Sequence, residues 1–431
     1  MKTVIMAGGK GTRISSLFSD IPKPMIRIDG VPVLEREIEC LISQGFDDII
    51  ITVSHLGQII MDYFGDGSGV SPATGKPFHA HISYYFEKTP LGNGGALLKI
   101  KDQLTDEFLL LNADAVFDVN FKRFVEAHHK MGGLVTLFVH SNSHPYDSGL
   151  LITDKSGAVL QWLTKEDDRP RWYFNIVNAG LHVMNKKVLD YVVETPRVDL
   201  DRQILKPLAG TGKMFVYNSP EYVEDMGTPE RYEKVQQSFR SGMIHARNLA
   251  NKQKAVFLDR DGTINRYAGY LTDPEDFELL PGVAEAIRKI NLSGYLAIVV
   301  TNQPSIARGE LTFDGLDEIH RKMETLLGQK GAYVDHIYYC PHHPDKGFPG
   351  EVPSLKIDCN CRKPKPGMLL QAAEDFNIDL ASSWIVGDDG KDIGAGKNAC
   401  CHTAFIGNQD FGQEKTVQSL LQFVDETLPE G

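Results

Sequence analysis

Short apolar runs alternate with amphipathic, helix-like stretches along the whole chain. The runs are rich in β-branched residues and have the length of strands rather than of helices. They predict strands at Thr3–Ala7, Ile49–Val53, Phe108–Leu111, Leu134–Val139, Val256–Leu258, Leu296–Val300 and Trp384–Val386. Because strand and helix patterns alternate in this way, the chain is predicted to have an α/β fold.

A polar, helix-prone stretch interrupts this alternation between about residues 230 and 253. Directly after it, Ala255-Val-Phe-Leu-Asp259 begins a new strand, and the alternation starts afresh. A chain of 431 residues is also too long for one ordinary core. We therefore expect two domains, residues 1–238 and 254–431, joined by a linker at 239–253. Near the end of the chain, Val417–Thr427 has the pattern of a plain amphipathic helix.

Composition and charge narrow the class of protein. The formal net charge of −12 argues against a nucleic-acid-binding protein. No apolar run approaches the roughly 20 residues that span a bilayer. Cys40, Cys400 and Cys401 show no disulfide framework, which favours a reducing compartment. We expect a cytoplasmic protein that binds neither nucleic acid nor membrane, and the sequence leaves homo-oligomerisation open.

Four potential zinc ligands are gathered in two short pairs. Cys340-Pro-His342 is followed seventeen residues later by Cys359-Asn-Cys361. Three thiolates and one imidazole complete a tetrahedral zinc site and leave no coordination position for a substrate. We therefore predict a structural Zn²⁺ that joins the two ends of a loop. A catalytic metal would have to bind at a different site. The alternative is a set of unrelated buried cysteines beside a surface histidine.

A glycine-rich loop follows the first predicted strand. In Gly8-Gly9-Lys10-Gly11-Thr12-Arg13 the backbone can approach a triphosphate closely, and Arg13 can meet its charge. The loop matches neither the P-loop nor the dinucleotide-binding pattern. Taken singly, Lys23 could be a surface charge, and Asp114 and Asp225 could cap a strand end and a turn. Further motifs follow in order: Pro22-Lys23-Pro24-Met25, Leu91-Gly-Asn-Gly94-Gly95-Ala96, Leu111-Asn-Ala-Asp114, Asn178-Ala-Gly180 and Glu224-Asp225-Met-Gly-Thr-Pro229.

Over residues 1 to about 235 these motifs together resemble the sugar-1-phosphate nucleotidyltransferases. The resemblance implies a Rossmann-like domain with a mixed sheet, in which a sugar-phosphate oxygen attacks the α-phosphorus of a nucleotide and expels pyrophosphate. It also implies that Asp114 and Asp225 hold Mg²⁺ and that Arg13 and Lys23 stabilise the transferring group. Lys165 matches the lysine that receives the sugar phosphate, although Thr164-Lys165-Glu166 departs from the usual Glu-Lys. The implied nucleotide contacts are Gly8, Gly9, Gly11, Thr12, Gly94 and Asn178.

Two carboxylates follow the strand that opens the second half. Asp259 can attack phosphorus, and Asp261 can pass a proton to the leaving oxygen. Together with Thr301-Asn302, Arg362-Lys363 and Asp388-Asp389, this arrangement resembles the four motifs of the haloacid dehalogenase phosphatases. The resemblance implies a Rossmannoid domain with Mg²⁺ at Asp259, Asp261 and Asp388. It implies substrate contacts from Thr301, Asn302, Gln303, Arg362 and Lys363. For Asp389 and Asp392, helix capping is an equally good interpretation.

Smaller motifs narrow this resemblance. Gly269-Tyr270, Ile306-Ala-Arg-Gly309 and the zinc pairs are similar to those of D-glycero-D-manno-heptose-1,7-bisphosphate 7-phosphatases over about residues 254–410. Histidinol-phosphate phosphatases are close relatives of that family. In this interpretation the zinc cluster orients Arg362 and Lys363 over the substrate. Pro304-Ser305 departs from the usual Ser-Gly, which removes one backbone N–H donor.

The two halves would then catalyse consecutive steps. The phosphatase would release a heptose 1-phosphate, and the first half would resemble the guanylyltransferases that convert this sugar phosphate to GDP-heptose. Heptose phosphates and GTP or another nucleoside triphosphate are the expected partners. The base stays open because no residue of the glycine loop identifies it. One alternative is a transferase for another sugar 1-phosphate or base joined to a histidinol-phosphate-like phosphatase. Another is that one half is a degenerate binding module.

Overall fold

The computed structural model describes residues 1–9, 18, 20–193 and 195–429, and these form two compact units. The first unit comprises Met1–Val139, Leu151–Trp162 and Asn178–Asn248. The second comprises His140–Leu150, Leu163–Val177 and Leu249–Gly431. The chain passes between the units inside the segment expected to be the linker, but two segments before residue 238 belong to the second unit. The boundaries 1–238 and 254–431 therefore stay a prediction that differs from this division.

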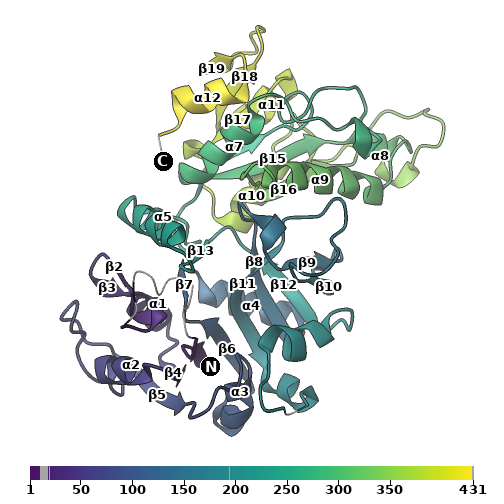
Figure 1. The fold of residues 1–431 in the computed structure, drawn as a ribbon. Helices are drawn as coiled ribbons and strands as arrows, with labels where there is room; N and C mark the ends of the chain where they lie inside the picture. The colour runs from purple at the N-terminus through teal and green to yellow at the C-terminus, as the bar shows by residue number, and fades with distance from the viewer. Residues whose placement is uncertain (10–17, 19, 194, 430–431) are drawn as a thin grey trace. The chain divides into compact units, whose positions relative to one another are not determined.

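The first unit is built on a mixed sheet, as expected for its fold class (Figure 1). In its centre β1 (Lys2–Met6) pairs in parallel with β4 (Asp48–Val53) and β6 (Glu107–Asn112). β5 (His81–Phe86) continues the parallel part, whereas β11 (Val177–Asn185) runs antiparallel to β6. The other strands of this sheet are β8 (Val135–His140), β9 (Leu150–Thr153), β10 (Val159–Leu163) and β12 (Met214–Asn218).

Alternate strand residues bury one face of this sheet against helices. Ile5, Ile49 and Ile51 pack in one apolar cluster with side chains of α1 (Val33–Ile42), α2 (Gly57–Phe64) and α4 (Phe121–Met131). The period of two along a strand places these side chains on the same face. The strands β7 (Ala115–Asp118) and β13 (Tyr222–Asp225) form a separate antiparallel pair. Other short elements are β2 (Arg27–Ile28), β3 (Val31–Pro32) and α3 (Gly95–Ile100).

The polar stretch at about residues 230–253 contains less helix than its sequence predicts. α5 (Pro229–Arg240) is capped by Thr228, whose hydroxyl accepts from the Arg231 N–H. Ile244–Lys254 has a helix-like pattern, yet only α6 (Met243–Ala246) forms there, and Lys254 already belongs to a strand. Asp118 accepts hydrogen bonds from Asn248 and His245, which ties the end of α6 to β7 within the first unit.

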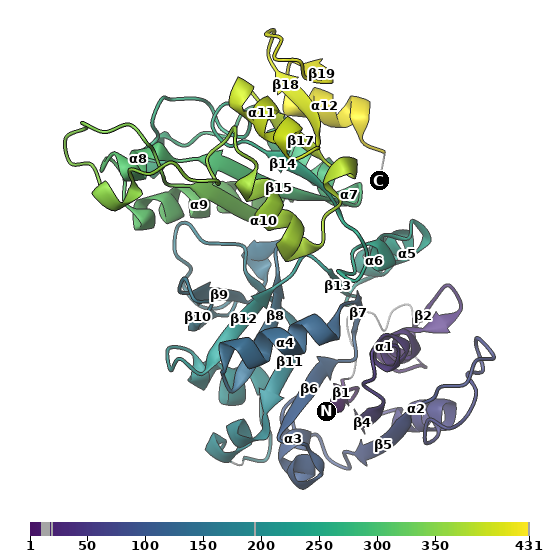
Figure 2. The same ribbon diagram turned by 180° about the vertical axis from the view of Figure 1, so that it is seen from behind.

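The second unit contains a six-stranded parallel sheet in the order β16-β15-β14-β17-β18-β19. Val256 and Leu258 pack with α7 (Val283–Leu292), α9 (Phe313–Gly328) and α12 (Leu420–Thr427), whereas Ala255 and Phe257 pack with α10 (Gly367–Phe376) and α11 (Gly390–Asn398). Helices thus cover both faces, as Figure 2 shows from behind. The strands are β14 (Lys254–Leu258), β15 (Tyr295–Asn302), β16 (His336–Cys340), β17 (Trp384–Gly387), β18 (His402–Ile406) and β19 (Lys415–Val417).

This topology gathers the phosphatase motifs at one edge of the sheet. β14 is the central neighbour of both β15 and β17, and all three are parallel. Parallel strands end at the same edge, so Asp259, Thr301 and Asp388 meet there. Val417 lies in β19, so the last helix begins three residues later than predicted. Within the described part of the chain, no helix is both long and apolar enough to cross a bilayer.

Two segments from the first half of the chain, residues 140–150 and 163–177, belong to the second unit and pack on its helix α9. The Thr325 hydroxyl accepts from the Tyr173 N–H at 2.9 Å and contacts the Tyr173 carbonyl at 3.2 Å. The Glu324 carboxyl accepts from the Asn175 N–H at 2.5 Å. Asn175 in turn donates to the Asn142 carbonyl, which joins the two segments to each other. The excursion between β10 and β11 is therefore bound to the second unit by buried hydrogen bonds.

Glu324 makes this attachment sensitive to pH. Burial raises the pKa of Glu324 to about 7, although the Asn175 hydrogen bond opposes the increase. The folded state then binds a proton that the unfolded state releases near its ordinary pKa of about 4.5, so stability falls as pH rises from about 4.5 to 7. Replacing Glu324→Gln should remove this loss, which is on the order of 2–3 kcal/mol. Thermal unfolding of both proteins at pH 5 and pH 8 measures it.

Glu318→Gln is the matched control, because Glu318 is an exposed glutamate on the same helix. It should leave the pH dependence of the wild type unchanged. Equal pH dependence in wild type and Glu324→Gln would show that the carboxyl at residue 324 does not carry this effect.

Candidate active sites and metal centre

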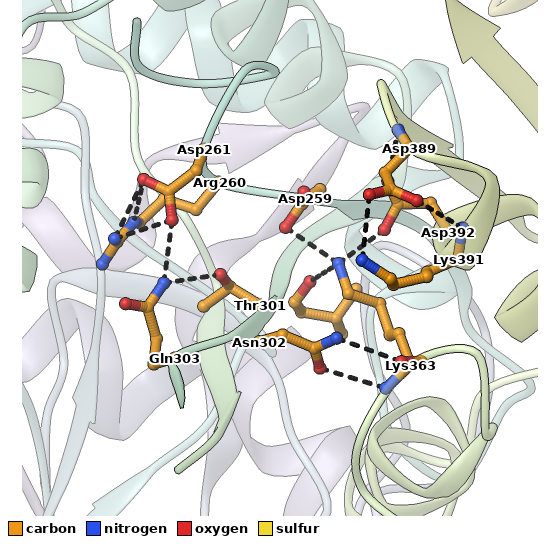
Figure 3. Close-up of polar contacts among 11 residues, drawn as sticks. Asp259, Arg260, Asp261, Thr301, Asn302, Gln303, Lys363, Asp389, Lys391 and Asp392 are labelled. Atoms are coloured by element: carbon orange, nitrogen blue, oxygen red, sulfur yellow. Dashed lines mark hydrogen bonds and ion pairs between the residues drawn. The ribbon is translucent and has the colours of Figure 1, made fainter. Parts of the chain in front are cut away.

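A buried ammonium group lies between two carboxylates at the edge of the parallel sheet (Figure 3). Lys363 Nζ is 2.8 Å from Asp259 Oδ1 and 2.6 Å from Asp392 Oδ1, and it also donates to the Val300 carbonyl. Burial raises the pKa of Asp259, and although Lys363 opposes this, Asp392 and Asp261 add to it. Asp259 is thus fixed in position with its neighbours, as a nucleophile must be.

Asp261 faces a different partner. The fully buried guanidinium of Arg260 donates to both Asp261 oxygens at 2.9 and 2.8 Å, and Gln303 and Asn265 also donate to this carboxylate. Burial raises the pKa of Asp261, but Arg260 and these hydrogen bonds outweigh it and leave the pKa below its usual value. The sequence grouped Asp261 with Asp259 and Asp388 as magnesium ligands, and that role stays a prediction.

Three carboxylates converge near the end of β17. One oxygen each of Asp259, Asp388 and Asp392 lies within 4.8 Å of the others. Burial raises the pKa of Asp388 to about 6, and repulsion from Asp259 adds to the shift. Gly262 allows this approach, because a Cβ there would come within 1.9 Å of Asp388 Oδ2. Carboxylate oxygens are the ligands that Mg²⁺ prefers, so this set fits the predicted ion, with Asp392 added.

Asp392 and Asp389 also cap helix α11. The Asp389 side chain accepts from the Lys391 N–H, and the Asp392 side chain accepts from the Asp389 N–H. The sequence left capping and function equally open for these two residues. Asp392 combines both, because its other oxygen holds Lys363.

The predicted phosphate-binding residues line a cavity of about 280 Å³ beside Asp259. Thr301 and Gln303 are joined by a hydrogen bond of 2.9 Å, and Asn302 exchanges two hydrogen bonds with the backbone of Lys363. The structure therefore brings together all of the second half's predicted catalytic and substrate-binding side chains. The lining also contains two exposed tyrosines that were not predicted as site residues. The complete lining is Asp259, Asp261, Tyr267, Gly269, Tyr270, Leu271, Thr301, Asn302, Gln303, Pro304, Ser305, Arg362, Lys363, Asp388, Asp389, Lys391 and Asp392.

The four predicted zinc ligands form one cluster. The sulfurs of Cys340, Cys359 and Cys361 are 3.2 to 3.4 Å apart, and His342 Nδ1 is 3.4 Å from the Cys361 sulfur. Ligands about 2.3 Å from a tetrahedral zinc would place the sulfurs roughly 3.8 Å apart, somewhat farther than they lie here, and the donor set of three thiols and one imidazole fits Zn²⁺. Arg362 follows the cluster directly and donates to the His342 carbonyl at 3.2 Å. Zinc occupancy stays a prediction.

The first unit contains a cavity of about 460 Å³ at the end of β1. Gly8, Gly9, Lys23 and Asp114 line it, as predicted for a nucleotide site. The buried Lys23 ammonium is 2.8 Å from Asp114 Oδ2. The complete lining is Met6, Ala7, Gly8, Gly9, Lys23, Pro24, Thr52, Ser54, Glu87, Pro90, Gly92, Asn93, Asn112, Ala113, Asp114 and Gly227.

Asp225 reaches this region through strand pairing. Its register partner in β7 is Ala115, directly after Asp114, and the Met226 N–H donates to the Asp114 carbonyl at 3.2 Å. The Asp225 side chain accepts from Arg231 and from the Gly227 N–H. Asp225 thus ends β13, and Asp114 stands directly before β7, the strand that pairs with it. Carboxylates are ligands that Mg²⁺ prefers, and the magnesium role of these two aspartates stays a prediction.

The other predicted transferase residues differ in how they are placed. Gly94 packs tightly, since a Cβ there would lie 3.0 Å from the Leu200 backbone nitrogen. Asn178 Oδ1 accepts from the Gly180 N–H in β11. Lys165 lies just beyond β10, in the excursion that belongs to the second unit. Gly11, Thr12 and Arg13 lie outside the described residues.

Sequence reasoning missed three acidic or basic groups near the sites. Glu37 is buried, and neither carboxyl oxygen has a hydrogen-bond partner; burial and repulsion from Asp114 raise its pKa well above the usual value. Glu87 lines the first cavity. Arg260 holds Asp261. Only Arg260 had a sequence signal, because it stands between the paired aspartates.

Two family models match the chain. The nucleotidyl transferase family matches residues 2–242, and the HAD-hydrolase-like family matches residues 360–422. Curated D-glycero-beta-D-manno-heptose-1,7-bisphosphate 7-phosphatases are also similar to the chain. That of Pasteurella multocida is 46% identical over 148 residues, which are 34% of this chain and 77% of the relative. That of Escherichia coli K12 is 43% identical over 147 residues, which are 34% of this chain and 75% of the relative.

Solved structures resemble each half separately. HddC from Yersinia pseudotuberculosis is 26% identical, with a TM-score of 0.47, and the match covers 55% of this chain and 99% of HddC. A D,D-heptose 1.7-bisphosphate phosphatase from B. bronchiseptica, in complex with magnesium and phosphate, is 31% identical with a TM-score of 0.36. That match covers 40% of this chain and 97% of the phosphatase. Because both TM-scores lie below 0.5, these two likenesses support no functional assignment.

Substitution of one cysteine tests whether the cluster binds zinc. Cys359→Ser should lower bound zinc from about one ion per chain and lower the thermal stability of the second unit, since structural zinc contributes directly to folding. It should also loosen Arg362 and Lys363. Elemental analysis of the purified chain measures the metal, and calorimetry measures the stability.

Cys400→Ser is the matched control, because Cys400 is an exposed free cysteine in the same unit. It should keep full zinc content and stability. A wild-type chain with well under one zinc per molecule and an intact second unit would contradict the assignment.

Proposed function

Since the chain belongs to the nucleotidyl transferase family in its first half and to the D-glycero-beta-D-manno-heptose-1,7-bisphosphate 7-phosphatase family in its second, we propose that it makes a nucleotide-activated heptose in two steps. It is an enzyme with a transferase and a phosphatase domain. The phosphatase removes the 7-phosphate of D-glycero-D-manno-heptose 1,7-bisphosphate. The transferase then moves a guanylyl group from GTP to heptose 1-phosphate, giving GDP-heptose and pyrophosphate.

The observation that carries the proposal is the arrangement around Asp259. Lys363 holds this carboxylate beside a carboxylate cluster and a cavity of about 280 Å³. Asp259 attacks the 7-phosphorus, the bond to the sugar oxygen breaks, and an aspartyl phosphate forms. Water then releases phosphate and regenerates the carboxylate. Asp259, Asp388 and their neighbours would hold Mg²⁺, which would supply positive charge to neutralise the phosphoryl oxygens.

Asp261 supplies the proton to the leaving oxygen. Arg260, Gln303 and Asn265 hold it as a carboxylate before the substrate binds. A phosphoryl dianion beside Asp261 raises its pKa by repulsion, so arrival of the substrate favours the protonated form. This gives Asp261 the role of general acid in the first step and general base in the second.

The transferase reaction depends on charge neutralisation and alignment. Lys23 Nζ and Asp114 Oδ2 are 2.8 Å apart in the first cavity, and Asp225 ends β13, which pairs with β7 directly after Asp114. We propose that Lys23 holds the transferring phosphoryl group and that the two aspartates would hold Mg²⁺, which would supply charge to neutralise the triphosphate. The sugar-phosphate oxygen attacks the α-phosphorus, and pyrophosphate leaves. A panel of nucleoside triphosphates and sugar 1-phosphates tests the identities of base and sugar.

Substitution of the proposed nucleophile tests the phosphatase reaction. Asp259→Asn should abolish phosphate release from heptose bisphosphate, because a carboxamide cannot form the aspartyl phosphate. Guanylyl transfer to heptose 1-phosphate should stay within a few-fold of the wild type. Asp261→Asn should lower phosphate release by roughly 10²–10⁴-fold through lost proton transfer.

Both activities are measured on one preparation, with Asp358→Asn as the control, because Asp358 is exposed and pairs with Lys365. Phosphate release near the wild-type rate by Asp259→Asn would remove Asp259 as nucleophile.

Substitution of the proposed magnesium ligands tests the transferase reaction. Asp114→Ala and Asp225→Ala should each abolish Mg²⁺-dependent pyrophosphate release, since each change removes a proposed ligand. Lys23→Ala should weaken the reaction without changing its dependence on Mg²⁺. The exposed Asp102 in the same unit provides the control Asp102→Ala. Normal rate and normal Mg²⁺ dependence in Asp225→Ala would refute the proposed carboxylate pair.

A further inference from the structure

Two exposed tyrosine rings line the phosphatase cavity, whose other lining residues are mostly polar. Tyr267 is 67% exposed and Tyr270 is 49% exposed, and both line the cavity that contains Asp259. Large aromatic rings left in water beside a binding site are candidates for contact with a ligand that has an apolar face. Neither ring has a part in the chemistry at phosphorus described above.

Tyr270 is held by a side chain that does not line the cavity. The guanidinium carbon of Arg308 lies 4.3 Å from the centre of the Tyr270 ring and 4.2 Å from the centre of the Phe348 ring. Glu310 accepts from Arg308 Nε at 2.9 Å and so fixes the orientation of the guanidinium. A planar guanidinium can stack on both rings, which a lysine ammonium cannot do in the same way.

Phe348 is itself fixed within the loop 340–361. The Lys356 ammonium lies 4.5 Å from the Phe348 ring centre, and its side chain is almost fully buried. Glu351 accepts from the Phe348 N–H at 3.1 Å. Phe348 therefore offers Arg308 a rigid platform.

The backbone brings the loop against the segment that carries Arg308. The Val352 N–H donates to the Ala307 carbonyl at 3.0 Å. Gly309 has a φ of +76°, and a Cβ there would come within 1.9 Å of the Gly350 carbonyl oxygen. This close approach explains why a glycine follows Arg308 in the Ile306-Ala-Arg-Gly309 motif.

We propose that the Tyr270 ring supports the sugar of the phosphatase substrate and that Arg308 is a positioning residue that holds this ring against Phe348. The C–H face of a sugar packs on an aromatic ring, while its hydroxyls stay in contact with polar groups and water. This inference rests on the proposed phosphatase function and adds a determinant of specificity to it. The ring distinguishes a phosphorylated sugar from a small phosphate ester that cannot reach it.

The test compares two substrates of the Mg²⁺-loaded full-length chain, heptose 1,7-bisphosphate and ethyl phosphate. In Arg308→Ala and in Tyr270→Leu, the ratio of kcat/KM for the sugar to kcat/KM for ethyl phosphate should fall about 3- to 10-fold, the range expected for one lost aromatic contact. The fall should come from KM for the sugar, with kcat within about twofold of the wild type. Tyr270→Phe should retain the wild-type ratio, because it keeps the ring.

Arg288→Ala, at an exposed arginine of helix α7, is the control. If Arg308→Ala does not fold, Tyr270→Leu carries the same test, since it shortens only a half-exposed side chain. An unchanged ratio in Tyr270→Leu, or a loss in Tyr270→Phe equal to that in Tyr270→Leu, would overturn the proposal. A wild-type chain that releases no phosphate from heptose 1,7-bisphosphate would instead overturn the proposed phosphatase function.

Discussion

The phosphatase centre depends on one buried ammonium group. Lys363 contacts Asp259, Asp392 and the Val300 carbonyl, and its backbone exchanges two hydrogen bonds with the Asn302 side chain. These contacts join the ends of β14 and β15 to the start of helix α11. Loss of the lysine would leave two buried carboxylates without a counter-charge, at a cost of about 3–5 kcal/mol. The same residue therefore determines both the position of the nucleophile and the integrity of the centre.

Lys363 also connects this centre to the cysteine cluster. Cys361 and Lys363 are separated by a single residue, and Arg362 between them donates to the His342 carbonyl. A zinc ion held by Cys340, His342, Cys359 and Cys361 would thus restrict the backbone from which both basic side chains extend. The first unit reaches its geometry by other means, because Asp114 and Asp225 are brought near each other by the register of β7 and β13. One centre is organised by a buried charge and the other by backbone pairing.

Much of the second unit's site could be predicted because its residues directly follow parallel strands. Asp259, Thr301 and Asp388 had to meet once β14, β15 and β17 were neighbours. The role of Asp392 was undecided because its capping signal and its charge point to different roles, and in the structure it both caps α11, of which it is part, and contacts Lys363. The attachment of Tyr173 and Asn175 to helix α9 had no local signal, since the partners lie about 150 residues away in the chain. Only tertiary packing could reveal it.

That attachment has a consequence for how the polypeptide can be divided. A protease that cut the chain near Asn248 would produce two fragments, but the N-terminal fragment would still carry Tyr173 and Asn175, whose backbone groups bond to Thr325 and Glu324 of the other. The nicked protein would keep these non-covalent contacts and would behave as a split protein whose pieces complement each other. Conversely, a fragment that began at Leu249 would expose the part of helix α9 that these segments cover. If the two halves were expressed as separate polypeptides, they would therefore have to associate in order to cover this part of helix α9.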